Sequence, residues 1–173
     1  KLEKKFKNRF KFYRLKFSTI DKVLKKDVEA IIFDLGLSSI QLKNLSRGFS
    51  FNSKQTLDMC MGLSNLSAQD VVNKFSEKEL KSIIKILGEE KDAYKIARKI
   101  VEAREEKKIT KVDELVRIIE KSKKRNYLTR INPSTKTFQA LRIFVNKEIT
   151  ELLNGIVNAS KVLKPGGKIL IVS

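Results

Sequence analysis

Two short runs of apolar residues, one toward each end of the chain, predict strands of a β-sheet. Residues 30–33 (AIIF) and 169–172 (ILIV) are continuously apolar, which is typical of parallel strands covered by helices on both faces. Residues 10–17 (FKFYRLKF) alternate between apolar and basic side chains, and this period predicts a strand buried on one face. The segment from Ser18 to Lys26 keeps its apolar residues on one helical face and predicts a short helix capped by Ser18.

The middle of the chain, residues 67–123, has a helical period instead. Its apolar side chains recur every three or four positions, as on one face of an amphipathic helix. Ser67, Ser76 and Thr110 are each followed three residues later by an acidic residue, and such pairs form capping boxes at helix starts. Gly88 stands where a glycine commonly ends a helix. These signals predict a small helical bundle with a core of its own.

The longest periodic segment follows a basic linker. Residues 121–136 carry several basic side chains and no acid. After Pro133, apolar residues spaced three and four apart continue from Phe138 to Leu163, which predicts one helix of about seven turns. The Pro-Gly-Gly of residues 165–167 ends that helix, and the apolar run at 169–172 follows it.

Together these patterns predict an α/β protein whose sheet domain is interrupted by an inserted helical domain. The expected division is 1–65 for the first part of the sheet domain, 66–131 for the insert and 132–173 for the second part. Residues 34–66 show no steady period, and a loop of this length inside a compact domain is usually functional or disordered. Interspersed apolar residues argue against disorder here.

Composition excludes several kinds of enzyme. The 173 residues are 41% apolar, so the chain can bury a core, and they include no histidine. Hydrolases that depend on histidine, histidine-ligated zinc sites and imidazole acid–base catalysis are therefore excluded for this chain. The single cysteine, Cys60, cannot form an internal disulfide, which points to a reducing compartment. We expect no membrane span, because no apolar run approaches 18 residues, and no signal peptide.

The charge favours a polyanionic partner. Lysine and arginine total 38 against 20 acids, which gives a net charge of +18 and a pI near 10.0. Such a field attracts nucleic acid without specifying a sequence, although a lysine-rich proteome would also produce it. The linker residues Lys123, Lys124 and Arg125 either face RNA or belong to a solvated connector, and both alternatives stay open.

The strongest candidate for chemistry is an acid at the end of a predicted strand. Asp34 directly follows the apolar run 30–33 and precedes Gly36. In open parallel sheets, ligands lie in the crevice beyond the carboxyl ends of the strands. A carboxylate there can accept a hydrogen bond from a ligand, or it can simply cap the following turn. Gln41, between two apolar residues, carries an amide that could be held in a defined place.

A second candidate segment is Arg47-Gly-Phe-Ser-Phe51, which combines a cation with two aromatic rings. This combination suits base stacking and phosphate contact. The alternative is that Phe49 and Phe51 anchor the loop in the core. Arg142 and Asn146 lie one turn apart on the predicted long helix, away from its apolar stripe.

In their order along the chain, several segments resemble the RsmH (MraW) family of bacterial ribosomal RNA methyltransferases. They are DLGLSSIQL (34–42), RGFSF (47–51), LDM (57–59), GEE (88–90), KIARKIVEAR (95–104), NPSTKTFQALRIFVNKEI (132–149) and LKPGGKILIVS (163–173). The FQALRIFVN stretch and the block from DLG to RGFSF are the most specific, whereas the Pro-Gly-Gly segment is shared by many class I methyltransferases.

The resemblance implies a class I, Rossmann-like methyltransferase domain interrupted by a helical substrate-recognition domain. It also implies S-adenosyl-L-methionine as the cofactor and the small ribosomal subunit, through its 16S rRNA, as the partner. The expected reaction is methylation of the exocyclic N4 of a cytidine near the decoding centre, in the cytoplasm.

The family pattern places cofactor contacts on Phe17, Asp34 and Gln41. The residue that accepts the proton is not identified, and the candidates are Asp34 and a backbone carbonyl near residues 36–38. With the residue patterns above, contacts to the RNA substrate are expected at Arg47, Phe49, Lys123, Lys124, Arg125 and Arg142.

The chain departs from the family pattern in places. The family has a glycine-rich loop upstream of the matching region and a SFHSLED segment downstream, so the resemblance predicts a chain truncated at both ends and inactive by itself. Asn132 stands where the family has histidine, and Cys60 and Lys136 where it has arginine. Two alternatives therefore stay open: a non-catalytic rRNA-binding assembly module, and a class I methyltransferase with another substrate.

Overall fold

The two continuously apolar runs form a parallel pair of strands. In the computed structural model, β1 (Val28–Asp34) pairs with β2 (Leu163–Val172) in a two-stranded sheet, with Ile31 opposite Ile169. The structure describes residues 9–25, 27–38, 45–62, 65–123 and 132–172. Parallel strands need a long crossover between them, and here all the α-helices of the described residues lie between β1 and β2 in sequence. The predicted α/β class is confirmed.

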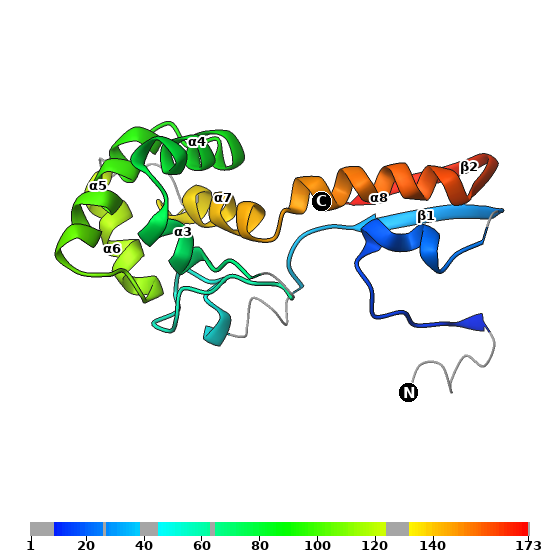
Figure 1. Cartoon of the computed structure of the whole chain (residues 1–173), viewed down its shortest axis with the longest axis horizontal. Helices are drawn as coiled ribbons and strands as arrows, with labels where there is room; N and C mark the ends of the chain where they lie inside the picture. Colours follow the sequence, from blue (N-terminus) through cyan, green and yellow to red (C-terminus); the bar gives the residue numbers. More distant parts are fainter. Residues whose placement is uncertain (1–8, 26, 39–44, 63–64, 124–131, 173) are drawn as a thin grey trace. The chain divides into compact units, whose positions relative to one another are not determined.

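The chain divides into two compact units (Figure 1). The first, the sheet unit, combines the residues up to Gly36 with those from Ile149 onward, and the second, the helical unit, spans Leu37–Glu148. The helical unit includes residues outside the predicted insert because Leu57, Met59 and Phe138 share a core with the helices of residues 68–122. The units therefore begin and end elsewhere than the segments 1–65, 66–131 and 132–173, and that division into domains stays a prediction.

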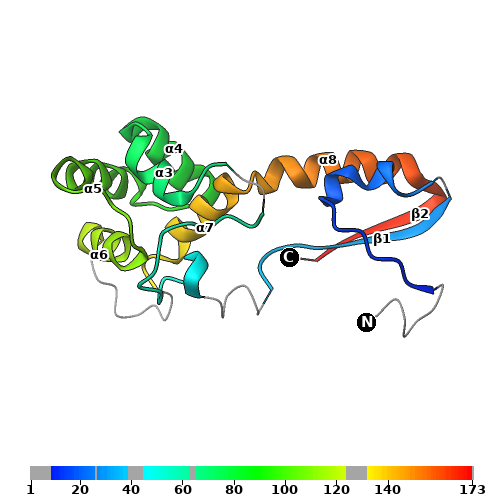
Figure 2. The ribbon, with the colours of Figure 1, turned by 60° about the horizontal axis from the view of Figure 1, so that its bottom comes forward.

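In the sheet unit, helix α8 (Glu148–Val162) covers one face of the sheet (Figure 2). Ile31 and Phe33 of β1 are buried there together with Ala159 and Val162. On the opposite face Ile32 is 66% exposed. The expectation that both faces of this sheet are covered is therefore wrong for the described part of the chain.

The strand predicted over residues 10–17 is also wrong. Residues 10–16 form no regular element, and Phe12, Tyr13 and Leu15 are exposed. A strand needs a neighbour for its backbone hydrogen bonds, and in the described residues β1 and β2 pair only with each other. The short helix after it is confirmed in part, as the 3₁₀ helix η2 (Phe17–Lys22), with Ser18 inside the helix and not at its cap.

The helical unit contains α3 (Ala68–Lys74), α4 (Glu77–Gly88), α5 (Ala93–Glu106), α6 (Val112–Ser122) and α7 (Thr135–Val145). The predicted capping boxes at Ser67 and Ser76 are confirmed, since each hydroxyl accepts the backbone N–H of an acid that bonds back. The box predicted at Thr110 and Asp113 is wrong by one residue: Glu114 accepts the backbone N–H of Lys111.

The predicted long helix is two helices. α7 ends at Val145 and α8 begins at Glu148, with Lys147 between them in the left-handed region at φ 52°. The Asn146 side chain lies at this break, where its Nδ2 donates to the carbonyl of Met59 at 2.8 Å and its Oδ1 accepts the N–H of Met61 at 2.6 Å. The apolar period continues across the break, so it could not reveal the break.

Candidate functional site

Asp34 lies at the carboxyl end of β1, as predicted. It stands opposite Val172 of β2, and Gly36 follows it with a φ of 104° that favours glycine. The Asp34 side chain is exposed and accepts no hydrogen bond from another described residue. The carboxylate is thus accessible to a ligand that approaches the ends of the two parallel strands.

Phe17 begins η2 and packs on the covered face of the sheet. Its ring meets that of the buried Phe33 edge-on, with the centroids 5.4 Å apart, and it stays 39% exposed. Gly155 of α8 makes room for it, because a Cβ at that position would lie 2.6 Å from the Phe17 ring. Adjacent strand residues point to opposite faces, so Phe17 lies on the α8 face and Asp34 projects from the open face.

Three predicted site residues, Gln41, Lys124 and Arg125, lie outside the described residues. Their proposed roles in cofactor and RNA binding stay predictions.

The Arg47 segment is anchored in the helical unit. Arg47 ends η3 (Leu45–Arg47), donates to the carbonyl of Cys60 and lies over the Phe49 ring, 5.4 Å from its centroid. Phe49 is only 7% exposed, and Phe51 packs edge-on against Phe138. In this structure both rings anchor the loop, and contact with RNA stays a prediction for Arg47 and Phe49.

Lys123 and Arg142 are both held in ion pairs. The Nζ of Lys123 lies 2.5 Å from Glu90 Oε2 and 2.8 Å from the carbonyl oxygen of Pro133, and Glu90 is 4% exposed. Arg142 forms a two-point pair with Glu148, at 2.8 and 3.0 Å. Both cations therefore bond to groups within the chain, and their contacts with RNA stay predictions.

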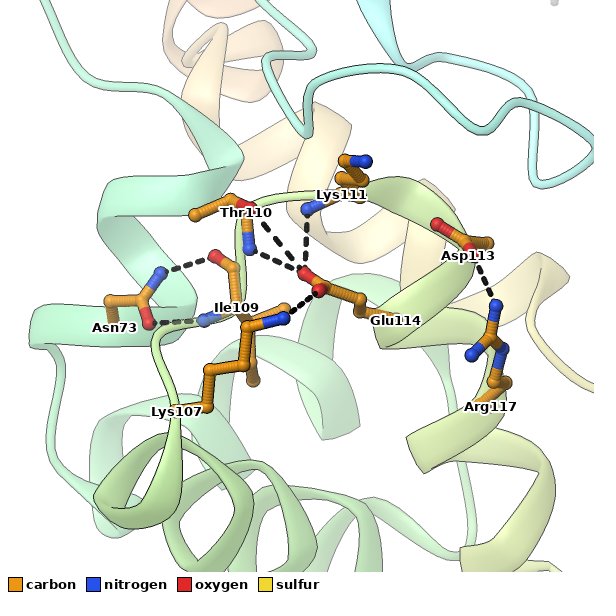
Figure 3. A network of polar contacts seen from close by, with 8 residues as sticks. All are labelled: Asn73, Lys107, Ile109, Thr110, Lys111, Asp113, Glu114 and Arg117. Atoms are coloured by element: carbon orange, nitrogen blue, oxygen red, sulfur yellow. Dashed lines mark hydrogen bonds and ion pairs between the residues drawn. The ribbon is translucent and has the colours of Figure 1, made fainter.

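A polar network joins the start of α6 to the segment before it (Figure 3). One oxygen of Glu114 accepts the backbone N–H groups of Thr110 and Lys111, at 2.9 and 3.0 Å, and the other accepts Lys107 Nζ at 3.1 Å. These hydrogen bonds, chiefly that from Thr110, lower the pKa of Glu114 to about 2 against the cost of its burial. The sequence predicted Asp113 instead, because Asp113 lies three residues after Thr110, whereas Glu114 lies three residues after a lysine, which is not a usual cap residue.

The Asn73 side chain continues this network from α3. Its Nδ2 donates to the carbonyl of Ile109 at 2.6 Å, and its Oδ1 accepts the N–H of the same residue at 3.0 Å (Figure 3). A single amide thereby satisfies both backbone groups of a buried residue, which would otherwise be costly to leave unpaired. The network supports the fold of the helical unit.

The described residues contain no group of three or more His, Cys, Asp or Glu side chains that could hold a metal ion. No helix among them has the length and apolar character needed to cross a membrane.

The two parallel strands, the helix α8 on one face of them and the long helical segment between them in sequence agree with part of a Rossmann-like methyltransferase domain. The profile of a known family, described as the MraW methylase family, matches residues 1–173. The chain belongs to this family, and the resemblance found in its motifs is confirmed.

Two similar curated relatives carry the same name. A "Ribosomal RNA small subunit methyltransferase H" of Ehrlichia ruminantium (strain Welgevonden) is 45% identical over 179 residues, covering 100% of this chain and 60% of the relative. The protein of that name from Bartonella tribocorum (strain CIP 105476 / IBS 506) is 44% identical over 165 residues, covering 95% of this chain and 50% of the relative. The chain thus spans 60% or less of the length of these relatives.

Proposed function

We propose that the protein containing this chain methylates the exocyclic N4 of a cytidine in small-subunit rRNA, with S-adenosyl-L-methionine as the methyl donor. The match of the whole chain to relatives named as small-subunit rRNA methyltransferases carries this proposal. The net charge of +18 agrees with an RNA substrate. We place the reaction in the cytoplasm, where ribosomal RNA is assembled into subunits.

Asp34 is the proposed link between the fold and the reaction. When bound, S-adenosyl-L-methionine supplies a methyl group activated by a positively charged sulfur. The cytosine amine is a weak nucleophile because its lone pair is delocalised into the ring. The Asp34 carboxylate, exposed at the end of β1, can accept a hydrogen bond from that amine, weaken this delocalisation and receive the proton it must lose. Alignment of the two reactants supplies a further part of the rate enhancement.

The proposed cofactor contacts are Phe17, Asp34 and Gln41. The chemistry of the two described side chains fits the donor, because a carboxylate can accept from its amine or hydroxyl groups and a half-exposed ring can lie against adenine. Since Phe17 and Asp34 belong to opposite faces of β1, a ligand touching both would have to lie across the end of the strand. The same carboxylate is thus proposed to serve either the cofactor or the proton transfer, and the two roles require separate measurements.

The proposed RNA contacts are best tested at Lys124 and Arg125. Lys123 and Arg142 are held in ion pairs and Arg47 is bonded to Cys60, so changing them would disturb the fold as well as any binding of RNA.

The test uses the product of the complete reading frame that encodes this chain. We expect Asp34→Asn to abolish methyl transfer to small-subunit rRNA, and equilibrium dialysis with labelled S-adenosyl-L-methionine then shows whether the variant still binds the cofactor. Asp27→Asn is the matched control, because Asp27 is an exposed aspartate just before β1. Unchanged uptake and turnover in Asp34→Asn would refute its assignment.

Two further results bear on the function itself. If the parent protein takes up no donor but still binds rRNA, it is a non-catalytic assembly module. If the N4-methyl mark persists in small-subunit rRNA from a deletion strain, detected by mass spectrometry, the enzyme acts on another substrate.

A further inference from the structure

The helical unit carries a basic hollow that none of the predicted sites includes. It has a volume of about 350 Å³ and lies between the start of α5 and the end of α6. It is lined by Tyr94, Lys95, Arg98, Lys99, Lys121 and Ser122. The hollow is open to solvent, and four of its six lining side chains are cationic.

The nearby acids neutralise these cations only in part. Asp92 Oδ1 lies 2.9 Å from Lys95 Nζ, and Glu102 pairs with both Arg98 and Lys99, at 2.8 and 2.6 Å. Two carboxylates therefore face four cations. Ion pairs this exposed contribute little to stability, so a phosphate group can compete for the same side chains. Their present effect is to hold the three long side chains around the hollow.

An aromatic ring completes the site. Tyr94 is 52% exposed at the edge of the hollow, and Lys81 Nζ of α4 lies 5.9 Å from the centre of its ring. Single-stranded nucleic acids bind where a positively charged groove follows the backbone and aromatic rings stack the bases. An acidic peptide would use the cations but gain little from the exposed ring, so the combination favours RNA.

We propose that this hollow binds the phosphate backbone of unpaired RNA, with one base stacked on Tyr94. The site rests on the proposed function only in that small-subunit rRNA is the expected RNA. It lies on α5 and the end of α6, so it includes Lys121 of the basic segment 121–136 but none of Lys123, Lys124 and Arg125.

The first test compares two variants with equal loss of charge. The hollow variant combines Lys95→Gln, Arg98→Gln, Lys99→Gln and Lys121→Gln. The control variant combines Lys74→Gln, Lys107→Gln, Lys108→Gln and Arg117→Gln, which are exposed residues outside the hollow, three of them also in ion pairs. Binding of small-subunit rRNA and of a single-stranded oligonucleotide is measured across a salt series with the 173-residue chain.

We expect the hollow variant to bind at least ~10-fold more weakly than the control, with a salt dependence shallower by roughly 0.7 for each phosphate that it no longer neutralises. Tyr94→Leu should weaken binding of single-stranded RNA by roughly tenfold, while Tyr94→Phe should bind like the parent chain. Equal binding by the hollow and control variants overturns the proposal. Binding to the assembled small subunit is measured as well. A hollow variant that binds naked rRNA as the control does, but no longer binds the assembled subunit, also overturns the proposal, because the hollow would then recognise an acidic protein surface.

These results are separable from the proposed function. If the protein transfers methyl groups and the hollow variant binds RNA as well as its control, the proposed RNA site is refuted and the proposed function is not. If the protein transfers no methyl group but its RNA binding still depends on the hollow, the proposed enzymatic function is refuted and the proposed RNA site is supported.

Discussion

Glu114 stabilises the start of α6 in a way that depends on pH. Its pKa is lowered from 4.5 to about 2 in the folded chain. A lowered pKa means that the stabilisation is complete above the pKa of the unfolded chain and is lost as the pH falls toward the folded value. We expect Glu114→Gln to reduce the free energy of unfolding by about 1–2 kcal/mol at neutral pH, since hydrogen bonds to a charged acceptor are replaced by weaker ones. Urea denaturation at several pH values measures this difference.

The difference between Glu114→Gln and the parent should shrink as the pH falls from about 4.5 to about 2. Glu79→Gln is the comparison, because Glu79 also accepts backbone and hydroxyl hydrogen bonds, from Ser76, but is exposed. Its effect should be the smaller of the two. A loss of stability in Glu114→Gln that stays constant over this pH range would contradict the argument.

Lys123 should behave as a structural residue. Its ammonium group donates to the buried Glu90 and to the carbonyl of Pro133. Lys123→Met therefore leaves a buried carboxylate without its cationic partner, although the N–H of Asp92 still donates to it. We expect a loss of roughly 2–3 kcal/mol, somewhat below the value for a fully buried pair, measured by urea denaturation. Lys121→Met, at an exposed position two residues earlier, should be close to neutral.

The double variant Glu90→Gln with Lys123→Met tests the cause. It should recover part of the lost stability, because the unpaired charge is removed. A Lys123→Met variant as stable as the parent would contradict this structural role and leave the solvated or RNA-facing role that the linker sequence suggests.

At the scale of single residues, the sequence shows which side chains could contact RNA, but it does not show which groups of the folded chain they bond to. Arg47, Phe49 and Lys123 have the chemistry of RNA contacts, yet each is engaged by groups elsewhere in the fold. Lys123 and Glu90 are 33 positions apart, and no local pattern connects them. Asp34 differs, since its place at the end of β1 followed from a continuous apolar run.

At the scale of elements, the end of α4 shows two distinct backbone requirements. The residue in the left-handed conformation is Glu89, at φ 50° and ψ 35°. Gly88 is needed for another reason: a Cβ there would lie 2.4 Å from the carbonyl oxygen of Lys136, where α4 and α7 approach each other. The sequence thus identified Gly88 as important for the end of α4, but for its conformation and not for the close approach of α7.

These requirements predict opposite effects for adjacent substitutions. Glu89→Gly should raise the free energy of unfolding by about 0.5–1 kcal/mol, because glycine adopts this conformation without strain. Gly88→Ala should lower it by roughly 1–3 kcal/mol through overpacking. Thermal unfolding followed by circular dichroism measures both, with Glu89→Ala as the control for loss of the side chain. A stabilising Gly88→Ala would show that the helices can separate without cost.

Elements were predictable where their signals are local. The helices of residues 67–123 follow from apolar spacing and capping residues within one or two turns. The break between α7 and α8 depends on hydrogen bonds from Asn146 to a loop more than 80 positions away. The spacing of apolar residues carries no information about these bonds. The predicted strand at 10–17 failed because alternation describes a side-chain pattern and cannot provide a neighbouring strand.

At the scale of the whole molecule, the two units have very different cores. The buried cluster of the helical unit includes residues of all five described α-helices of that unit, α3–α7, and of the loop at Leu57 and Met59. That of the sheet unit contains only Ile31, Phe33, Ala159 and Val162 among the described residues. The sequence predicted an α/β part interrupted by a helical part, but it could not predict that the described residues leave one face of the sheet open.

This imbalance predicts unequal stability. An isolated pair of strands is marginal in water, and here one helix covers one face while Ile32 remains exposed on the other. We expect backbone amides of β1 and β2 to exchange with solvent at least ~100-fold faster than those in the middle of α4 and α5, because local opening follows local burial. Hydrogen exchange of the 173-residue chain, resolved by NMR or by mass spectrometry of fragments, measures the ratio.

The same experiment on the product of the complete reading frame shows whether the open face is the cause. If further chain covers Ile32 there, protection of β1 should rise toward that of α4, while α4 and α5 should change little because their core is already closed. Ile32→Ser is the matched variant: it should cost little in the 173-residue chain, where the side chain is exposed, and much more in the longer protein. Equal protection of β1 and α4 in the 173-residue chain would mean that the two units unfold together despite their unequal cores.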